Sequence, residues 1–413
     1  MKNKIIYITI LLILIILSIC IIYTKNNKQK EEYEEQTTYE EKIIDEKNIT
    51  VKEEENIAIT QSGTYTLTGK SDNSKITVNT EDEVTLILDN LELTNKEGPA
   101  ILIENSKHTT ILLKNNNKLS NGENEEFDAV IYSKDDLTIN GDGTLEIISN
   151  YENGIKCKDD LIINSNITIN SNTNGIIGKD SVTISGDINI TSKGDAIKAN
   201  NDEEESKGNI TIENANIKIN SKEKGIQAEN NLTINDGTID INSKDDGIHS
   251  NKNITINNGK ITVTSIDDGL HADEIVEINN GEIIVNAHEG IEGTLVKIND
   301  GTIIINAQDD GINAGKKSNE IPTIEINGGN LTIKMSDGDT DAIDSNGNLY
   351  INGGTINITG NSAFDYDGEG IYKNGTIIVN GKETNELTNQ FMGGPGGMQD
   401  KNMNGGPNQG MRR

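Results

Sequence analysis

Strict alternation of apolar and polar residues runs through most of the chain after residue 127. In residues 247–263 the apolar positions of three short segments share one side, and they are Ile248, Ile254, Ile256, Ile261 and Val263. Alternation with a period of two is typical of β-strands that bury one face. Helical periodicity is missing from the sequence after residue 24. The pattern therefore predicts an all-β protein.

The three-strand unit recurs about every 21 or 22 residues. A small residue opens each unit, at Ala129, Gly154, Gly175, Ala196, Gly225, Gly247, Gly269, Gly290, Gly311, Ala342 and Ala363. Two longer units carry insertions, NDEEESKG near residue 201 and KKSNEIPT near residue 316. A propeller blade needs ~40 residues, and a leucine-rich repeat carries its own Leu/Asn pattern and a helix. The repeat instead predicts a single-stranded parallel β-helix whose coils stack ~4.8 Å apart.

The repeat divides the chain into five segments. We expect a signal peptide or membrane anchor in residues 1–24, a charged linker in 25–50, irregular first coils and an N-terminal cap in 51–126, the β-helix repeats in 127–380, and a disordered Gly/Met/Asn-rich tail in 381–413.

An apolar run, residues 5–23, follows Lys2 and Lys4. It is long enough to cross a bilayer, which needs ~20 apolar residues. An uncleaved anchor, a cleaved secretory signal and a lipoprotein signal lipidated at Cys20 remain open. All three export the rest of the chain. We therefore expect the protein on the extracellular face of the cell membrane or at the cell surface, with membrane contact through this run.

The excess of acidic residues limits the classes of molecule that the chain can bind. The sequence has 36 Lys and Arg against 67 Asp and Glu, a net charge of −31. This argues against sequence-independent nucleic-acid binding, which depends on basic side chains. Two cysteines exclude a disulfide scaffold and a Cys-rich zinc site. Cys157 takes the small-residue position of its unit, so we predict a buried free thiol.

Two turn positions repeat with the unit. Asparagine recurs at one of them, in Asn235, Asn257, Asn279, Asn299, Asn327 and Asn352. Ladders of such amides can hydrogen-bond between stacked strands. Small residues recur at a second corner, in Ser171, Ser192, Ser221, Ser243, Ser265, Ala287 and Ala307. We predict that both sets are structural.

Acidic residues recur where the units begin in the C-terminal half of the repeat. The residue before the opening Gly or Ala forms a first column: Asp246, Asp268, Glu289, Asp310 and Asp341, with Asp245, Asp267 and Asp309 one position earlier. The outward position of the following strand forms a second column: His249, His271, Glu292, Asn313 and Asp344. Stacked coils place equivalent residues ~5 Å apart. Each pair of like charges then costs about 0.8 kcal/mol even in water.

A bound counter-ion relieves such repulsion. Carboxylate and amide oxygens suit a hard cation, and Ca²⁺, with 6–8 oxygen ligands, fits best. We therefore predict calcium as the cofactor, held by the acidic residues of both columns and by Asp245, Asp267 and Asp309. His249 and His271 leave Zn²⁺ or Ni²⁺ open. Solvated Asp-Gly turns without a metal are a third interpretation.

A row of exposed threonines is a weaker candidate site. It comprises Thr183, Thr211, Thr233 and Thr255 and continues as Glu277, Lys297 and Glu325. Regularly spaced hydroxyls can contact a polymer, so Thr211, Thr233 and Thr255, with His249, His271 and Asn313, are candidate carbohydrate contacts. The alternative for the threonines is β-propensity on an exposed face. The sequence has no nucleophile elbow, His-Glu-x-x-His motif or phosphate loop, so we assign no catalytic residue.

The repeats GDAIKAN, DDGIHSN, DDGLHAD, DDGINAG and TDAIDSN, with AFDYDGEG and a Gly/Met tail, resemble a family of bacterial exported carbohydrate-binding proteins. The opening GTYTLTGKSDNSKITVNTEDEVTLILDNLELTN resembles the start of that family, and the resemblance covers about residues 48–400. It implies a right-handed parallel β-helix, similar in fold to family 9 pectate lyases. It also implies binding of calcium and of cellulose or pectin-type polygalacturonate. The implied ligands are the Asp pairs of DDGIH, DDGLH and DDGIN, with Asp341 and Asp344; His288-Glu289-Gly290 departs from this pattern.

The leading functional expectation is an exported, monomeric, calcium-dependent protein that binds cell-wall-type polysaccharide. A calcium-dependent pectate lyase is the alternative enzyme, and it needs a base at the proton α to the uronate carboxylate. Lys156 and Lys198 lie in the second column, but two or more coils away from the acidic residues. A structural stalk or adhesin is the third interpretation.

Overall fold

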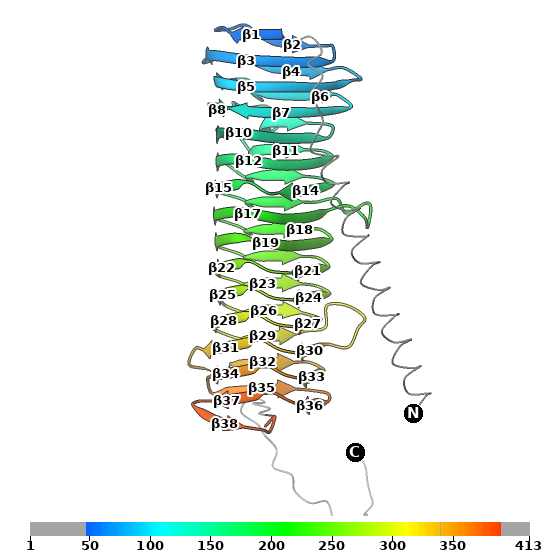
Figure 1. The fold of residues 1–413 in the computed structure, drawn as a ribbon, viewed down its shortest axis with the longest axis vertical. Helices are drawn as coiled ribbons and strands as arrows, with labels where there is room; N and C mark the ends of the chain where they lie inside the picture. Colours follow the sequence, from blue (N-terminus) through cyan, green and yellow to red (C-terminus); the bar gives the residue numbers. More distant parts are fainter. Residues whose placement is uncertain (1–46, 339, 390–413) are drawn as a thin grey trace, which may run out of the picture. The chain divides into compact units, whose positions relative to one another are not determined.

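Parallel β-coils stack into one long β-helix in the computed structural model, which describes residues 47–338 and 340–389 (Figure 1). Each coil has three faces. The first face is a 14-stranded sheet of β2 (Ile57–Ile59), β4 (Ile76–Asn79), β6 (Ile101–Asn105), β9 (Ala129–Ser133), β11 (Asn153–Cys157), β13 (Ile176–Gly178), β16 (Ile197–Ala199), β18 (Ile226–Ala228), β20 (Ile248–Ser250), β23 (Leu270–Ala272), β26 (Ile291–Gly293), β29 (Ile312–Ala314), β32 (Asp341–Ser345) and β35 (Ser362–Tyr366).

The other two faces share a 24-stranded sheet. The second face holds β1 (Lys47–Val51), β7 (His108–Lys114), β14 (Ser181–Ile184), β21 (Asn253–Ile256), β24 (Ile275–Ile278), β27 (Leu295–Ile298), β30 (Thr323–Ile326), β33 (Asn348–Ile351) and β36 (Gly370–Tyr372). The third face holds β8 (Asn116–Ser120), β15 (Asp187–Ser192), β22 (Lys260–Thr264), β25 (Glu282–Ala287), β28 (Thr302–Ala307), β31 (Asn330–Met335), β34 (Thr355–Thr359) and β37 (Thr376–Val379).

Six long strands run across both of these faces without a break: β3 (Gly63–Ser71), β5 (Glu83–Thr94), β10 (Leu137–Ile148), β12 (Asp160–Ser171), β17 (Asn209–Ser221) and β19 (Asn231–Asn242). The predicted second and third strands of a unit are therefore separate only in some coils. The all-β parallel β-helix is confirmed. The last strand, β38 (Lys382–Thr384), pairs antiparallel with β37 and lies at the start of the segment predicted as a tail.

The interior is a continuous stack of aliphatic side chains. Ile248, Ile256 and Val263, from the three faces of one coil, are all fully buried. The opening glycines are needed because the corner is narrow. A Cβ on Gly247 would lie 2.1 Å from Cγ1 of Val263, well inside van der Waals contact. The second corner is equally tight, and its predicted Ser and Ala residues are at most 8% exposed.

The predicted asparagine ladder is confirmed. Its amides donate from each coil to the preceding one, as in Asn257 to Asn235 at 2.8 Å, Asn299 to Asn279 at 2.7 Å and Asn352 to Asn327 at 2.8 Å. Cys157 is a buried free cysteine as predicted, and burial raises the pKa of its thiol to about 12. A thiol with a raised pKa stays protonated at neutral pH, which favours a structural role over a nucleophilic one.

We expect Asn299→Ala to lower the free energy of unfolding by about 1–2 kcal/mol, because it leaves hydrogen-bonding groups of two neighbouring amides unpaired. Asn299 donates to Asn279 at 2.7 Å and accepts from Asn327 at 2.9 Å. Asn242→Ala is the control, since Asn242 is exposed on β19 and outside the ladder. Thermal unfolding followed by far-UV circular dichroism measures both. Equal midpoints for the two variants would contradict a stabilising ladder.

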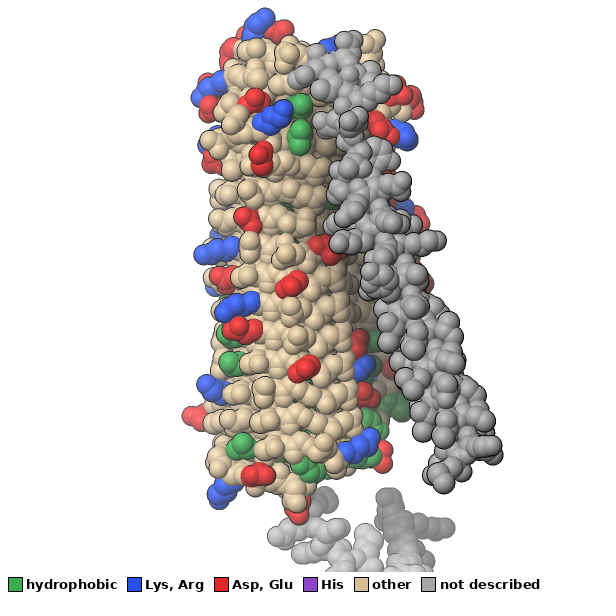
Figure 2. All heavy atoms as spheres, viewed as in Figure 1, with side chains coloured by type: hydrophobic (Ala, Val, Ile, Leu, Met, Phe, Trp, Pro, Cys, Tyr) green, Lys and Arg blue, Asp and Glu red, His purple; other side chains and the backbone are tan. Residues whose placement is uncertain are grey.

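One side of the β-helix carries mainly uncharged polar side chains and backbone, with charged side chains scattered over it (Figure 2). The predicted membrane segment, residues 5–23, lies outside the described residues, as do residues 390–413 of the predicted tail. Within residues 47–338 and 340–389, no helix has the length and apolar character to cross a membrane.

Candidate functional site

The two acidic columns lie side by side along the first face. The second column is aligned by β-pairing, which joins His249 to His271, His271 to Glu292, Glu292 to Asn313 and Asn313 to Asp344. The first column occupies the turn before each strand. There the N–H of each opening glycine donates to the carbonyl of the next column member, as from Gly247 to Asp268 at 2.8 Å. Both columns therefore form the arrays that the repeat predicts.

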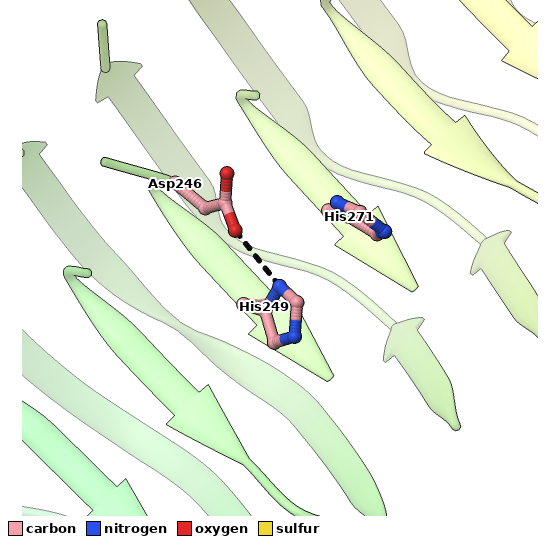
Figure 3. A group of neighbouring side chains, drawn as sticks. All are labelled: Asp246, His249 and His271. Carbon is pink, nitrogen blue, oxygen red and sulfur yellow. Dashed lines mark hydrogen bonds and ion pairs between the residues drawn. The ribbon is translucent and has the colours of Figure 1, made fainter. Parts of the chain in front are cut away.

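The N-terminal end of the first column is neutralised by the protein itself. The Lys224 ammonium lies 2.5 Å from Asp246 Oδ2 and 3.2 Å from Asp245 Oδ1. The Nδ1 atom of His249 lies 2.8 Å from the same Asp246 oxygen (Figure 3). Burial favours the neutral acid at Asp246. The hydrogen bonds from His249 and Lys224 outweigh burial and hold the pKa of Asp246 well below its usual range.

The acids of the next coil also have partners within the chain, although burial still raises the pKa of Asp268 above its usual value. His271 Nδ1 lies 2.8 Å from Asp268 Oδ2 and 3.2 Å from Glu292 Oε2. The Lys317 ammonium lies 3.1 Å from the other Glu292 oxygen. Burial lowers the pKa of His271, but the hydrogen bond to Asp268 and the charge of Glu292 raise it above its ordinary value overall. Asp246, Asp268 and Glu292 thus have cationic or histidine partners within the chain.

The C-terminal end of the columns differs at two of its carboxylates. Asp310 and Asp344 make no ion pair in the part of the chain that the structure describes. Burial and the charge of Asp344 raise the pKa of Asp310 to about 8. Burial and the charges of Asp365 and Asp341 raise the pKa of Asp344 to about 7. At neutral pH this end therefore carries carboxyl groups that are costly to ionise.

The donors at this end suit an oxygen-binding cation. The Asn313 amide donates to Glu289 Oε2 at 3.0 Å. Its own carbonyl oxygen, Oδ1, is buried without a hydrogen-bond partner among the described residues. A buried acceptor costs free energy unless a donor or cation satisfies it. Carboxylates together with an unsatisfied amide oxygen are the donor set that Ca²⁺ prefers.

Four groups of residues, all from the predicted set except His288, bring possible metal-binding atoms within 4.8 Å of one another. They are Asp246/His249/His271, Asp268/His271/Glu292, Asp245/Asp246/Asp267 and His288/Glu289/Asp309. The first three include residues that already pair with Lys224, Lys317 or a histidine. The fourth contains Glu289 and Asp309 and lies next to the uncompensated end. A metal role for any of these residues stays a prediction.

A further acidic group that was not predicted from the sequence lies where the first face meets the second, and it comprises Asp136, Asp159 and Asp160. A hydrogen bond with Asp180 raises the pKa of Asp159 to about 6. Asp180 is itself paired with Lys207 at 2.8 Å, so this corner has its own cation. The Asp-Asp pair before each strand was the signal that could have identified it.

The predicted threonine contacts and the lysines considered as catalytic bases lie outside the acidic part of the columns. Thr211, Thr233 and Thr255 are in register on the second face, and their row continues to Tyr350 and Ile371. The lysines weighed as bases are also paired, Lys156 with Asp128 at 2.6 Å and Lys198 with Asp195 at 2.9 Å.

Two cations of the site were not identified from the sequence. Lys224 directly precedes Gly225, so it occupies the first column one coil before Asp246, and extending the column upstream would have found it. Lys317 comes from the KKSNEIPT insertion, and nothing in the repeat indicates where its side chain goes.

Comparison with known proteins places the chain in a family. The model of the carbohydrate-binding domain-containing proteins matches residues 53–293 and 278–390. A carbohydrate-binding domain-containing protein of Acetivibrio thermocellus is 37% identical over 129 residues, which cover 28% of this chain and 45% of that protein. The match thus spans less than half of that relative's length.

A solved structure is also similar, the polysaccharide lyase-like protein from C. thermocellum in a gadolinium derivative. It has 27% sequence identity and a TM-score of 0.41, and the match covers 61% of this chain and 96% of that one. With the family model matched over most of the described β-helix, the chain belongs to the carbohydrate-binding domain-containing protein family.

Proposed function

We propose that the protein is an exported, cell-surface carbohydrate-binding protein that holds cell-wall-type polysaccharide through calcium at the C-terminal end of the two columns. Family membership supports the carbohydrate part. The single observation that carries the calcium part is the half-buried pair Asp310 and Asp344, which makes no ion pair among the described residues and whose pKa values are raised to about 8 and about 7.

The ligands proposed for this end are Glu289, Asp310, Asp344 and Asn313 Oδ1. Bound calcium would supply the positive charge that these half-buried carboxylates lack. Four protein groups do not fill the 6–8 positions of a calcium ion, so positions remain for oxygen atoms of a saccharide. A net charge of −31 repels polyuronates. A cation shared between protein and uronate carboxylates offsets that repulsion and favours pectin-type chains.

Export and surface location are part of the proposal. The apolar run at residues 5–23 supports them, because each interpretation of that run places the β-helix outside the cytoplasm. Extracellular calcium-binding modules commonly work with Kd values of about 10⁻⁴–10⁻³ M. The proposed site has few carboxylates, and their pKa values are raised, so we expect its Kd for calcium to lie in that weak-binding range.

A carbohydrate array run with millimolar calcium and again with a chelator tests the proposal. We expect polygalacturonate to be retained with calcium and released by the chelator. Equal retention of polygalacturonate with calcium and with the chelator would show that binding does not depend on calcium. Retention of no polysaccharide at all, with calcium still stabilising the fold, would favour the structural stalk or adhesin.

We expect the purified β-helix to release no unsaturated product from polygalacturonate with calcium at pH 8.5. Burial lowers the pKa of Lys224, but the hydrogen bond and charge of Asp246 raise it overall, so this amine stays protonated. The pKa of Lys317 is raised in the same way by Glu292. A protonated amine cannot act as the base that a lyase needs.

Ultraviolet absorbance of the 4,5-unsaturated product is the assay. Turnover that Lys224→Ala or His271→Ala abolishes would contradict this prediction and establish the lyase. Lys260 serves as the comparison, because it pairs with Glu282 at 3.1 Å on the third face, away from the columns.

A further inference from the structure

The insertion between β29 and β30 forms one wall of a pocket of about 1040 Å³ on the second face. It is the yellow loop that projects from the stack in Figure 1. The loop is fixed at both ends. The Thr294 hydroxyl oxygen accepts hydrogen bonds from the backbone N–H groups of Lys317 and Ser318, both at 3.1 Å. At the other end, the N–H of Asn348 donates to the carbonyl of Pro322 at 2.9 Å.

We call this pocket the loop pocket. Its floor carries apolar side chains at a position where the preceding coils carry asparagine. Asn209, Asn231 and Asn253 stack in register with amide hydrogen bonds of 2.9 Å. The next two members of that row are Ile275 and Leu295, which line the pocket. The ladder stops there, and Asn253 Oδ1 is buried without a hydrogen-bond partner in the described chain.

Two more apolar side chains complete the pocket. Tyr350 lies in the lining beside Glu325, which occupies the equivalent position in the preceding coil. Ile321 is 67% exposed on the loop, the most exposed large hydrophobic residue among those described. Neither Ile275 nor Leu295 belongs to the interior, which is formed by their neighbours Val276 and Val296. The aliphatic and aromatic surface is therefore available to a ligand.

The polar groups of the pocket select the kind of ligand. Asn319, Asn348 and Ser318 offer amide and hydroxyl groups that hydrogen-bond to sugar hydroxyls. The carboxylates of Asp273, Glu274, Glu320 and Glu325 also line it and accept from hydroxyls. The lysine in the lining, Lys317, is already paired with Glu292 at 3.1 Å. This excess of negative charge disfavours a polyuronate and favours an uncharged chain.

We propose that the loop pocket binds an uncharged oligosaccharide without calcium, with sugar C–H faces on Ile275, Leu295 and Tyr350. Small-molecule sites usually measure about 300–1,000 Å³, so this pocket suits several linked sugars. The inference rests on the carbohydrate part of the proposed function. It uses a different face from the calcium columns, which gives the protein two saccharide sites of different charge preference.

Isothermal titration calorimetry in excess chelator tests the pocket, with cellohexaose, xylohexaose, mannohexaose and hexagalacturonate as probes. We expect at least one of the three neutral hexasaccharides to bind and hexagalacturonate to bind more weakly. Tyr350→Ala and Leu295→Asn should each weaken neutral binding about tenfold, the effect of losing a contact worth 1.4 kcal/mol. Leu295→Asn introduces the residue type that the preceding coils carry at this position, so the fold should tolerate it.

The matched control is Ile162→Asn, the same kind of change at an outward position of β12 on the second face, where Ile162 is 36% exposed. It should leave neutral binding unchanged, as should Asp310→Asn. No binding of any neutral probe, tighter binding of hexagalacturonate, or equal affinities for native protein and both pocket variants would each overturn the proposal. Because chelator is present throughout, failure of the calcium site does not affect these results.

Discussion

Millimolar calcium is expected to raise the thermal unfolding midpoint by several degrees at pH 8 and to change it little at pH 5. Asp310 and Asp344 have pKa values raised to about 8 and about 7 by burial and by neighbouring carboxylates. The unfolded values are about 3.9. The folded state therefore binds more protons than the unfolded state between these limits, and stability falls as pH rises from about 4 to 8. Calcium opposes that loss by compensating the ionised carboxylates.

The measurement is a series of circular dichroism melts from pH 5 to pH 8.5, with calcium and with a chelator. Asp310→Asn should flatten the pH dependence and reduce the calcium response, because an amide does not ionise. Asp240→Asn is the control, since Asp240 is exposed on the third-face part of β19. A midpoint that is unaffected by calcium at pH 8 would exclude a calcium site at the C-terminal end.

Asp310→Asn combined with Asp344→Asn is expected to abolish calcium-dependent retention on polygalacturonate. The two changes remove both uncompensated carboxylates, while the apolar interior is untouched because both columns face outward. Calcium affinity, measured by calorimetry, should fall by at least about tenfold, or 1.4 kcal/mol. Affinity electrophoresis through polygalacturonate gels measures the retention.

The matched control for this double variant is Asp268→Asn, which changes the same chemical group in the same column. Burial raises the pKa of Asp268 overall, but Asp268 also has a histidine partner, His271 at 2.8 Å, whose hydrogen bond favours the ionised carboxylate. We expect this variant to keep most of its calcium-dependent retention. If Asp268→Asn weakened calcium-dependent retention more than the double variant does, the metal site would instead lie at the histidine end of the columns.

Much of the fold could be predicted from the sequence because its causes are local. Alternation with a period of two decides which side chains face inward, and a repeat of about 21 residues returns each one to the same place in the next coil. The Asn299–Asn279 hydrogen bond and the pairing of His271 with Glu292 follow from that repetition alone. The alignment of the two columns could therefore be predicted from the sequence alone.

The chemical difference along these columns was decided by tertiary structure. The sequence indicates a uniform series of acids, but Lys224 and Lys317 lie within 3.1 Å of Asp246 and Glu292 and neutralise only one end. Lysine side chains are long and flexible, so the carboxylate that each one reaches depends on the path of the chain around it.

The loop pocket depends on tertiary structure for the same reason. The repeat predicts where an insertion begins and ends, but hydrogen bonds from Lys317 and Ser318 to Thr294 decide where it folds. By itself the sequence determined the β-helix, its inward face and the alignment of the columns, because these follow from short-range periodicity. Only the folded chain decided which carboxylates lack a counter-charge and where an apolar pocket opens, because both depend on side chains that meet outside the repeat.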